Sequence, residues 1–175
     1  LGDGGALLTN NDDLAIFAKS TRDHGRGRAL EAINWGRNSR LDSLNARIIL
    51  ERLKKLDCLI SRRRELADVY YENLKKLEER NLLNLPAKYS TNSDSLGTFQ
   101  NFEIKAKDRD ELMTFLAKNG VSTIKQWGGF NINDFPSTKK MFNKLLLLPL
   151  NHMMKIEEVK YISKTILSFY RNKND

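Results

Sequence analysis

One stretch of the sequence, residues 37–96, contains no glycine and a single proline, Pro86. Apolar residues between Leu41 and Leu77 recur in it mostly at steps of three to five, which is the spacing of an α-helical face. The spacing predicts one long helix, or two helices joined at a kink near residues 59–63. The helical pattern begins after Asn38 and ends near Arg80.

Composition narrows the class of protein further. The 175 residues include 40% hydrophobic residues, so the chain is expected to bury a core of one domain or parts of two. No apolar run approaches a membrane helix, and no basic and apolar leader opens the chain. The single cysteine, Cys58, excludes an internal disulfide and a cysteine metal site. We therefore expect a cytoplasmic protein without a metal, and a sequence that opens on Leu1 reads as a fragment.

The chain is strongly basic, with 30 Lys and Arg residues against 22 Asp and Glu residues. The densest basic run, Arg62-Arg63-Arg64, is followed at once by Glu65, and such mixed signs indicate a solvated helix face rather than a nucleic-acid surface. A second arginine group gathers between residues 22 and 40, among glycines. Phosphate or carboxylate anions are the natural ligands of that group.

The N-terminal part reads as a turn, a strand, a helix and a loop. Glycines at 2, 4 and 5 precede an apolar run at residues 6–9, which predicts a buried strand. Asn11, Asp12 or Asp13 can then cap a helix. Residues 21–38 have little periodicity and are expected to form a long loop, a feature that is often functional.

The remainder of the chain alternates strands and helices. Strands are predicted at residues 98–104 and 121–124, and a further apolar run lies at residues 145–150. Helices are predicted at residues 108–119, closed by Gly120, at 137–144 and at 156–170. A polar linker at residues 88–97 favours a change of subdomain between residues 85 and 95.

Several motifs, taken in order, resemble a known family. They are Gly2-Asp3-Gly4-Gly5, Arg22-Asp23-His24-Gly25, Gly36-Arg37-Asn38-Ser39-Arg40-Leu41-Asp42, Arg109-Asp110-Glu111-Leu112 and Leu148-Pro149-Leu150. Their order and spacing resemble the DegT/DnrJ/EryC1/StrS sugar aminotransferases over nearly the whole chain. The resemblance implies an α/β fold of the pyridoxal-phosphate-dependent transferase type I. Residues 1–84 would form the end of the large domain with a long connecting helix, and residues 85–175 a small α+β C-terminal domain.

The resemblance also implies a reaction. Enzymes of this family use pyridoxal 5'-phosphate to move an amino group from glutamate to a keto-deoxysugar nucleotide, act as homodimers, and serve nucleotide-sugar and polysaccharide biosynthesis. No nucleic acid or membrane partner is implied. The family's Schiff-base lysine would lie upstream of Leu1, so no catalytic residue is expected in this chain and the fragment alone is expected to be inactive.

Asn38 is the cofactor-binding candidate that the resemblance assigns. The matching asparagine of relatives reaches across the dimer interface to the cofactor phosphate of the neighbouring subunit, while capping of a helix by Asn38 or Ser39 is the alternative. Arg40 is a substrate-binding candidate, with pairing to Asp42 or to the dimer partner as alternatives. His24 belongs either to the structure of the loop or interface or to the rim of the active site.

Lys125 and Trp127 complete the substrate-binding candidates. They lie where relatives often carry a Tyr-Pro-x-Pro-x-His-like segment, and they can ion-pair with or stack on a sugar nucleotide. Packing of Trp127 in the subdomain core is an equal alternative. Two other functions stay open: a basic regulatory or nucleic-acid-binding module, and a catalytically dead homologue that acts as a scaffold.

Overall fold

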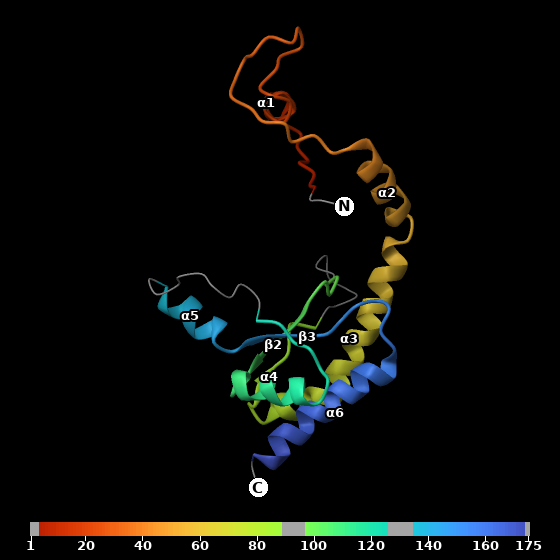
Figure 1. Cartoon of the computed structure of the whole chain (residues 1–175), viewed down its shortest axis with the longest axis vertical. Helices are drawn as coiled ribbons and strands as arrows, with labels where there is room; N and C mark the ends of the chain where they lie inside the picture. The colour runs from red at the N-terminus through yellow and green to blue at the C-terminus, as the bar shows by residue number, and fades with distance from the viewer. Residues whose placement is uncertain (1–3, 89–96, 126–134, 174–175) are drawn as a thin grey trace. The chain divides into compact units, whose positions relative to one another are not determined.

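The computed structural model describes residues 4–88, 97–125 and 135–173, and the chain divides into two compact units. The first unit spans Leu1–Leu56 and the second Asp57–Asp175. Figure 1 shows helices in both units and the strands in the second. The boundary predicted between residues 84 and 85 falls inside the second unit, because the strand that ends at Asn84 pairs with a strand beyond it.

Two capped helices frame the first unit. Helix α1 (Asp12–Thr21) begins at Asn11, whose Oδ1 accepts a hydrogen bond from the Leu14 amide at 2.9 Å. Helix α2 (Ser43–Leu53) begins at Asp42, whose Oδ1 accepts from the Leu44 amide at 2.8 Å. Capping satisfies amides that a helix leaves without partners. The cap predicted around Asn11 is confirmed, and the loop predicted between α1 and the long helical region is confirmed as well.

The first unit has almost no apolar core of its own. Among its described residues only Ser20 and Gly25 are buried. Leu8 and Trp35 are each 95% exposed, and Phe17 and Leu44 are more than half exposed. The predicted buried strand at residues 6–9 is wrong, because a strand needs a hydrogen-bonded neighbour and no described segment pairs with these residues. So much exposed apolar surface is characteristic of a region that another surface covers.

The long helical region is two helices, but the break differs from its predicted place. Helix α2 ends at Leu53, and helix α3 (Leu56–Glu79) follows after two residues. The predicted kink at residues 59–63 is wrong, since this stretch is continuous helix. The break sits at Lys54 and Lys55, where the Lys55 amide donates to the Arg52 carbonyl at 3.0 Å in a tight turn. The predicted end near Arg80 is confirmed.

Helix α3 carries one wall of the core of the second unit. Its inward residues are Leu66, Ala67, Tyr70, Tyr71, Leu74 and Leu77. They share a core with an antiparallel sheet of order β1 (Leu83–Asn84), β2 (Phe102–Ala106) and β3 (Leu145–Leu148). In β2, Phe102, Ile104 and Ala106 are buried and alternate with more exposed residues, as a half-covered strand requires. The Tyr70 ring stacks on Phe102 with centroids 4.7 Å apart.

Helices α4 (Arg109–Lys118), α5 (Pro136–Phe142) and α6 (Ile156–Asn172) complete the second unit. Figure 1 shows α4 alongside α6, and the Tyr161 hydroxyl of α6 donates to the carbonyl of Asn119 at 2.9 Å. These three helices were predicted, as was the closure of α4 by Gly120, whose φ is +74°. The predicted strand at residues 121–124 is reduced to one bridge, Ile124 to Leu147. The two-residue β1 was not predicted.

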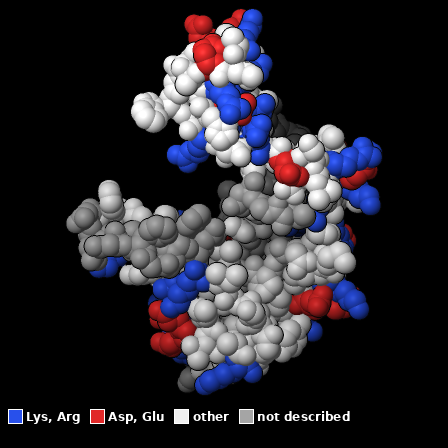
Figure 2. Space-filling view, turned by 45° about the horizontal axis from the view of Figure 1, so that its top comes forward, with Lys and Arg blue, Asp and Glu red and all other residues white. Residues whose placement is uncertain are grey.

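The three consecutive arginines of α3 form the expected mixed-charge face only in part: Arg62 pairs with Glu65, but each of the three arginines also binds backbone carbonyls. Arg62 donates to the Met154 carbonyl, and Arg64 donates to the Gly97 carbonyl at 3.0 Å. Arg63 donates to the carbonyls of Phe99 and Gln100 at 2.8 and 2.9 Å. Each guanidinium thus ties α3 to a distant backbone segment. Elsewhere the expected mixture of charges also holds, since acidic side chains adjoin basic ones in Figure 2. Lys54 and Glu51 form one ion pair of this kind, at 2.8 Å.

In the residues that the structure describes, no helix has both the length and the apolar character needed to cross a membrane. The longest, α3, carries charged side chains on most of its turns.

Because apolar side chains are buried in the second unit and exposed in the first, truncating one should reduce stability only in the second unit. Leu74→Ala opens a cavity beside the sheet, because Leu74 is fully buried. We expect the free energy of unfolding, measured in urea, to fall by about 3 kcal/mol. Leu53→Ala is the matched control on α2, since Leu53 is 54% exposed, and its effect should stay below about 0.5 kcal/mol. Far-UV circular dichroism follows both transitions. Equal losses in the two variants would contradict the assignment of the core.

Candidate functional site

The loop between α1 and α2 closes on itself through a short backbone ladder. Its two ends form an isolated antiparallel bridge between Asp23 and Asn38. Three hydrogen bonds surround the bridge: Arg37 amide to Thr21 carbonyl at 2.9 Å, His24 amide to Arg37 carbonyl at 3.2 Å, and Ser39 amide to Arg22 carbonyl at 2.9 Å. The backbone of Asn38 is therefore fixed next to the end of α1.

Two glycines allow this closure. Gly25 has a φ of +74°, and an added Cβ would collide with the backbone of Asn34. A Cβ on Gly36 would collide with the backbone of Gly25 and with the Thr21 carbonyl. The loop is also tied to α1 by the Asn34 side-chain amide, which donates to the Ser20 hydroxyl at 2.7 Å.

Asn38, Arg40 and Asp23 form one polar group on this ladder. Arg40 Nε donates to Asn38 Oδ1 at 3.3 Å, and Arg40 Nη1 lies 3.6 Å from Asp23 Oδ1. The Arg40 pairing occupies the Asn38 carbonyl oxygen, which leaves the amide NH₂ as the group that can serve another acceptor. Asp42 caps α2, so the structure gives the cap to neither Asn38 nor Ser39, and Arg40 pairs with Asp23 instead of Asp42.

Asn38 and Arg40 of this group line a cavity of about 890 Å³ within the first unit, and Asp23 does not. Its lining residues are Gly4, Gly5, Ala6, Leu7, Ala18, Lys19, Arg22, Asn38, Ser39, Arg40 and Leu41. Three of them carry positive charge and none carries negative charge. A cavity lined in this way favours an anion, and the amide of Asn38 adds an uncharged donor suited to a phosphate oxygen. Lys19 was not singled out from the sequence, since a lysine in a last helical turn is common.

His24 stands apart from this cavity. It is exposed and adopts a positive φ of 60°, and its amide belongs to the ladder. It is not one of the lining residues. The contacts that the structure gives His24 are thus those of loop structure.

Lys125 lies in the second unit and is held by a carboxylate. Its Nζ lies 2.5 Å from Asp110 Oδ1, and the same oxygen lies 2.8 Å from Arg109 Nε. The hydrogen bond from Lys125 lowers the pKa of Asp110, and the Arg109 charge acts in the same direction. The Arg109 side chain is only 10% exposed and reaches the carbonyls of Phe142 and Leu145 at 3.4 and 3.3 Å. Trp127 lies outside the described residues.

The sequence pointed to Asn38, Arg40 and Lys125, but it did not supply the partners that hold them. Asp23 lies seventeen positions before Arg40 and Asp110 fifteen before Lys125, so neither pairing follows a helical or strand period. No group of three or more His, Cys, Asp or Glu in the described ranges is placed to hold a metal ion.

Comparison with known proteins gives a consistent family. The model of the DegT/DnrJ/EryC1/StrS aminotransferase family matches residues 1–167. The dTDP-3-amino-3,6-dideoxy-alpha-D-galactopyranose transaminase of Aneurinibacillus thermoaerophilus is 29% identical over 93% of this chain and 46% of its own length. A protein of Geobacillus stearothermophilus named pleiotropic regulatory protein is 29% identical over 98% of this chain and 48% of its own.

A solved structure is similar to this chain as well. The NtdA protein of Bacillus subtilis, crystallised with bound cofactor PMP, superposes with a TM-score of 0.77 at 27% identity, covering 91% of this chain and 40% of that one. The chain thus spans about half the length of the curated relatives it matches.

Closure of the loop should fail when Gly36 gains a side chain. Gly36→Ala forces its Cβ into backbone atoms, and a cost of about 2 kcal/mol would raise the open population of the loop about 30-fold. Timed trypsin digestion at Arg26, Arg28 and Arg37 measures this opening. Gly5→Ala is the control, because its Cβ would meet nothing within 4 Å. Unchanged cleavage in Gly36→Ala would show that the loop is held by other contacts.

The pairing of Lys125 with Asp110 should appear in a titration. Lys125→Met removes the hydrogen bond that lowers the pKa of Asp110, so this pKa should rise toward about 3.9, the ordinary aspartate value. A lowered native pKa means that the pair stabilises the fold above about pH 4 and stops doing so as the pH falls through the native pKa. Carboxyl carbon NMR follows the titration. Lys118→Met, at the other end of α4, should leave it unchanged, and an identical Asp110 curve in all three proteins would refute the pairing.

Proposed function

We propose, because the chain belongs to the DegT/DnrJ/EryC1/StrS aminotransferase family, that it is the C-terminal portion of a pyridoxal-phosphate-dependent sugar aminotransferase. The reaction would move an amino group from glutamate to a keto-deoxysugar nucleotide. In this proposal residues 1–84 are the end of a type I large domain with the long connecting helix α3, and residues 85–175 are the small C-terminal domain, whose core α3 shares.

The anion-favouring cavity beside Asn38 is the observation that supports the proposal most. A cofactor phosphate carries two negative charges near neutral pH, and the lining residues Lys19, Arg22 and Arg40 carry only positive ones. The Asn38 amide offers a donor without further charge, while its oxygen is already held by Arg40. The residues present therefore fit the phosphate end of the cofactor.

When bound, pyridoxal phosphate supplies the electron sink for amino transfer. The work of this chain is binding and orientation. Asn38 would donate to the phosphate of the cofactor held by a neighbouring subunit, and Asp23 would keep Arg40 oriented toward an anionic group of the substrate. No residue of this chain is assigned to proton transfer.

Lys125 and Trp127, in the second unit, are the other substrate-binding candidates of this proposal. Lys125, whose ammonium is held by Asp110, would meet an anionic part of the sugar nucleotide, and Trp127 would stack on it. His24, which does not line the cavity, keeps in this proposal the alternative role in the structure of the loop. The similarity to the transaminase of A. thermoaerophilus supports a nucleotide-linked deoxysugar as the class of substrate.

A homodimer is part of the same proposal. The first unit exposes Leu8, Trp35, Leu44 and other apolar side chains, and burial of such a surface is what a stable subunit interface provides. The loop that carries Asn38 lies in this unit, so a second copy placed against it would bring Asn38 to the neighbouring active site.

A substitution at Asn38 tests the role in cofactor binding. Asn38→Asp replaces a donor with a negative charge facing the phosphate, so the affinity for pyridoxal phosphate should fall about tenfold or more. The test uses the longest natural protein that contains these 175 residues, and an absorbance titration gives the dissociation constant. Asn10→Asp is the matched control, since Asn10 is exposed in the same unit and does not line the cavity.

Release of 2-oxoglutarate from glutamate in the presence of keto-sugar nucleotides measures the reaction itself. Protein that binds no pyridoxal phosphate and aminates none of these substrates would contradict the proposed function and favour a scaffold. Cofactor binding that Asn38→Asp leaves unchanged would contradict only the role of Asn38.

A further inference from the structure

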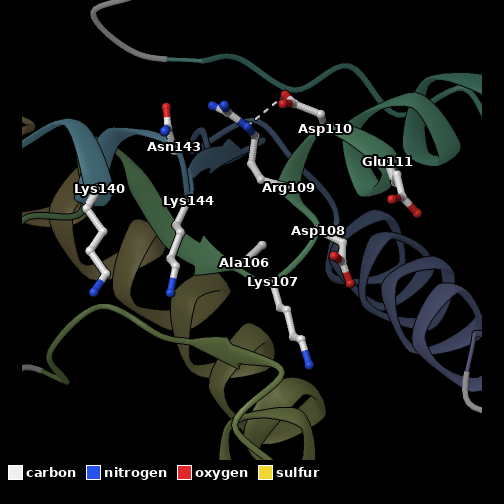
Figure 3. Close-up of a pocket in the computed structure, with 9 residues that line it drawn as sticks. All are labelled: Ala106, Lys107, Asp108, Arg109, Asp110, Glu111, Lys140, Asn143 and Lys144. Carbon is white, nitrogen blue, oxygen red and sulfur yellow. Dashed lines mark ion pairs between the residues drawn. The ribbon is translucent and has the colours of Figure 1, made fainter. Parts of the chain in front are cut away.

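A second cavity with several basic lining residues belongs to the second unit. It has a volume of about 470 Å³ and sits where β2 ends and α4 begins, against α5 and the residues that follow it. Figure 3 shows its nine lining residues: Ala106, Lys107, Asp108, Arg109, Asp110, Glu111, Lys140, Asn143 and Lys144. Four cations and three carboxylates line it, so its character depends on which charges are already paired.

Every carboxylate of this cavity has a cation. Asp110 is paired with Arg109 and with Lys125. Asp108 and Glu111 share Lys173, the residue directly after α6, at 2.9 and 2.7 Å, and these two hydrogen bonds raise the pKa of Lys173. The acidic residues are thus neutralised by Arg109 and by two lysines that do not line the cavity.

Three lysines remain. Within the described part of the chain, the ammonium groups of Lys107, Lys140 and Lys144 have no ion-pair or hydrogen-bond partner. Figure 3 shows the three side chains extending toward the same side, while Arg109 extends away from them to Asp110. No aspartate or glutamate occurs in residues 135–156, so the α5 side of the cavity adds no negative charge.

The backbone positions of these lysines are fixed. The Ala106 amide donates to the Lys144 carbonyl at 2.8 Å, which brings Lys144 next to the strand end that leads into Lys107. The Lys107 amide donates to the Leu82 carbonyl at 2.9 Å, and its carbonyl accepts from the Tyr170 hydroxyl at 2.7 Å. Lys140 lies four positions before Lys144. The unpaired charges are therefore gathered by folding, and their mutual repulsion is a cost that a bound anion would relieve.

We propose that this cavity binds a small anion with two or more phosphate groups. Lysine ammonium groups bind phosphate as point charges, and three of them suit a chain of phosphates better than one phosphate. The volume falls in the range of small-molecule sites, which favours a small ligand over a nucleic acid. This site lies in a different unit from the Asn38 cavity, and its occupation requires neither pyridoxal phosphate nor amino transfer.

Isothermal titration of the 175-residue chain with inorganic tripolyphosphate tests the proposal. We expect saturable binding at low ionic strength that weakens as potassium chloride is raised, because exposed charge interactions are screened by salt. The double variant Lys140→Glu/Lys144→Glu should bind about tenfold more weakly or worse, since it exchanges two attractions for two repulsions. Lys140→Arg/Lys144→Arg keeps both charges and should retain binding.

The matched control is Lys160→Glu/Lys164→Glu on α6, two exposed lysines with the same spacing and the same change of net charge. This control should bind as the unaltered chain does, and thermal unfolding checks that each variant folds. Adenosine triphosphate is a second probe: equal affinity would assign the binding to phosphates alone, and tighter binding would add a contact to the nucleoside.

Three results would overturn the proposal. They are no binding of either probe at low salt, an equal loss of affinity in the α6 control, and a mixed-sequence DNA oligonucleotide that displaces tripolyphosphate and binds more tightly.

Discussion

The stacking of Tyr70 on Phe102 is the contact on which the second unit depends. It joins the middle of α3 to the first residue of β2, and the Tyr70 hydroxyl donates to the Pro149 carbonyl at 2.8 Å. One side chain thereby ties α3 to both the central strand and the segment between β3 and α6. Burial raises the pKa of Tyr70, so the hydroxyl stays protonated and remains a donor. A buried hydroxyl without such a partner would cost free energy, which makes the position of Pro149 part of the core.

The first unit is organised by a different principle. Its described residues have no buried aromatic side chain that links their elements. They are ordered by helix caps, by the ladder of the Asn38 loop and by two close-packed glycines. Hydrogen bonds of this kind specify a conformation but add little net stability when they are open to water. The apolar side chains that would supply that stability point outward. We infer that the loop geometry is intrinsic to these residues, whereas their stability comes from surfaces that cover them in the proposed dimer.

The sequence predicted the elements that depend on interactions between residues close together in the chain, and it missed several that depend on distant residues. Helices α1, α4 and α6 were recognised because caps, Gly120 and helical spacing act within a few residues. The strands were harder. Residues 6–9 have the composition of a strand but no described neighbour, while β1 has only two residues and exists because β2 lies beside it. The backbone contacts of the α3 arginines were not predicted for the same reason, because the carbonyls that they bind lie more than thirty positions away.

At the candidate sites, the sequence likewise shows the number of charged residues but not which of them are paired. A net charge of +8 describes the chain as a whole, yet its cations do three different things. Arg63 binds backbone carbonyls and has become part of the scaffold. Arg40 and Lys125 are each held by one carboxylate, which orients them and lowers the charge they present to a ligand. Lys107, Lys140 and Lys144 have no carboxylate partner among the residues that the structure describes, because the carboxylates of their cavity are paired with other cations. The affinity of a surface for anions is thus decided by the pairing of its neighbours, which only the folded chain defines, and the two cavities differ for that reason although both are lined by lysine and arginine.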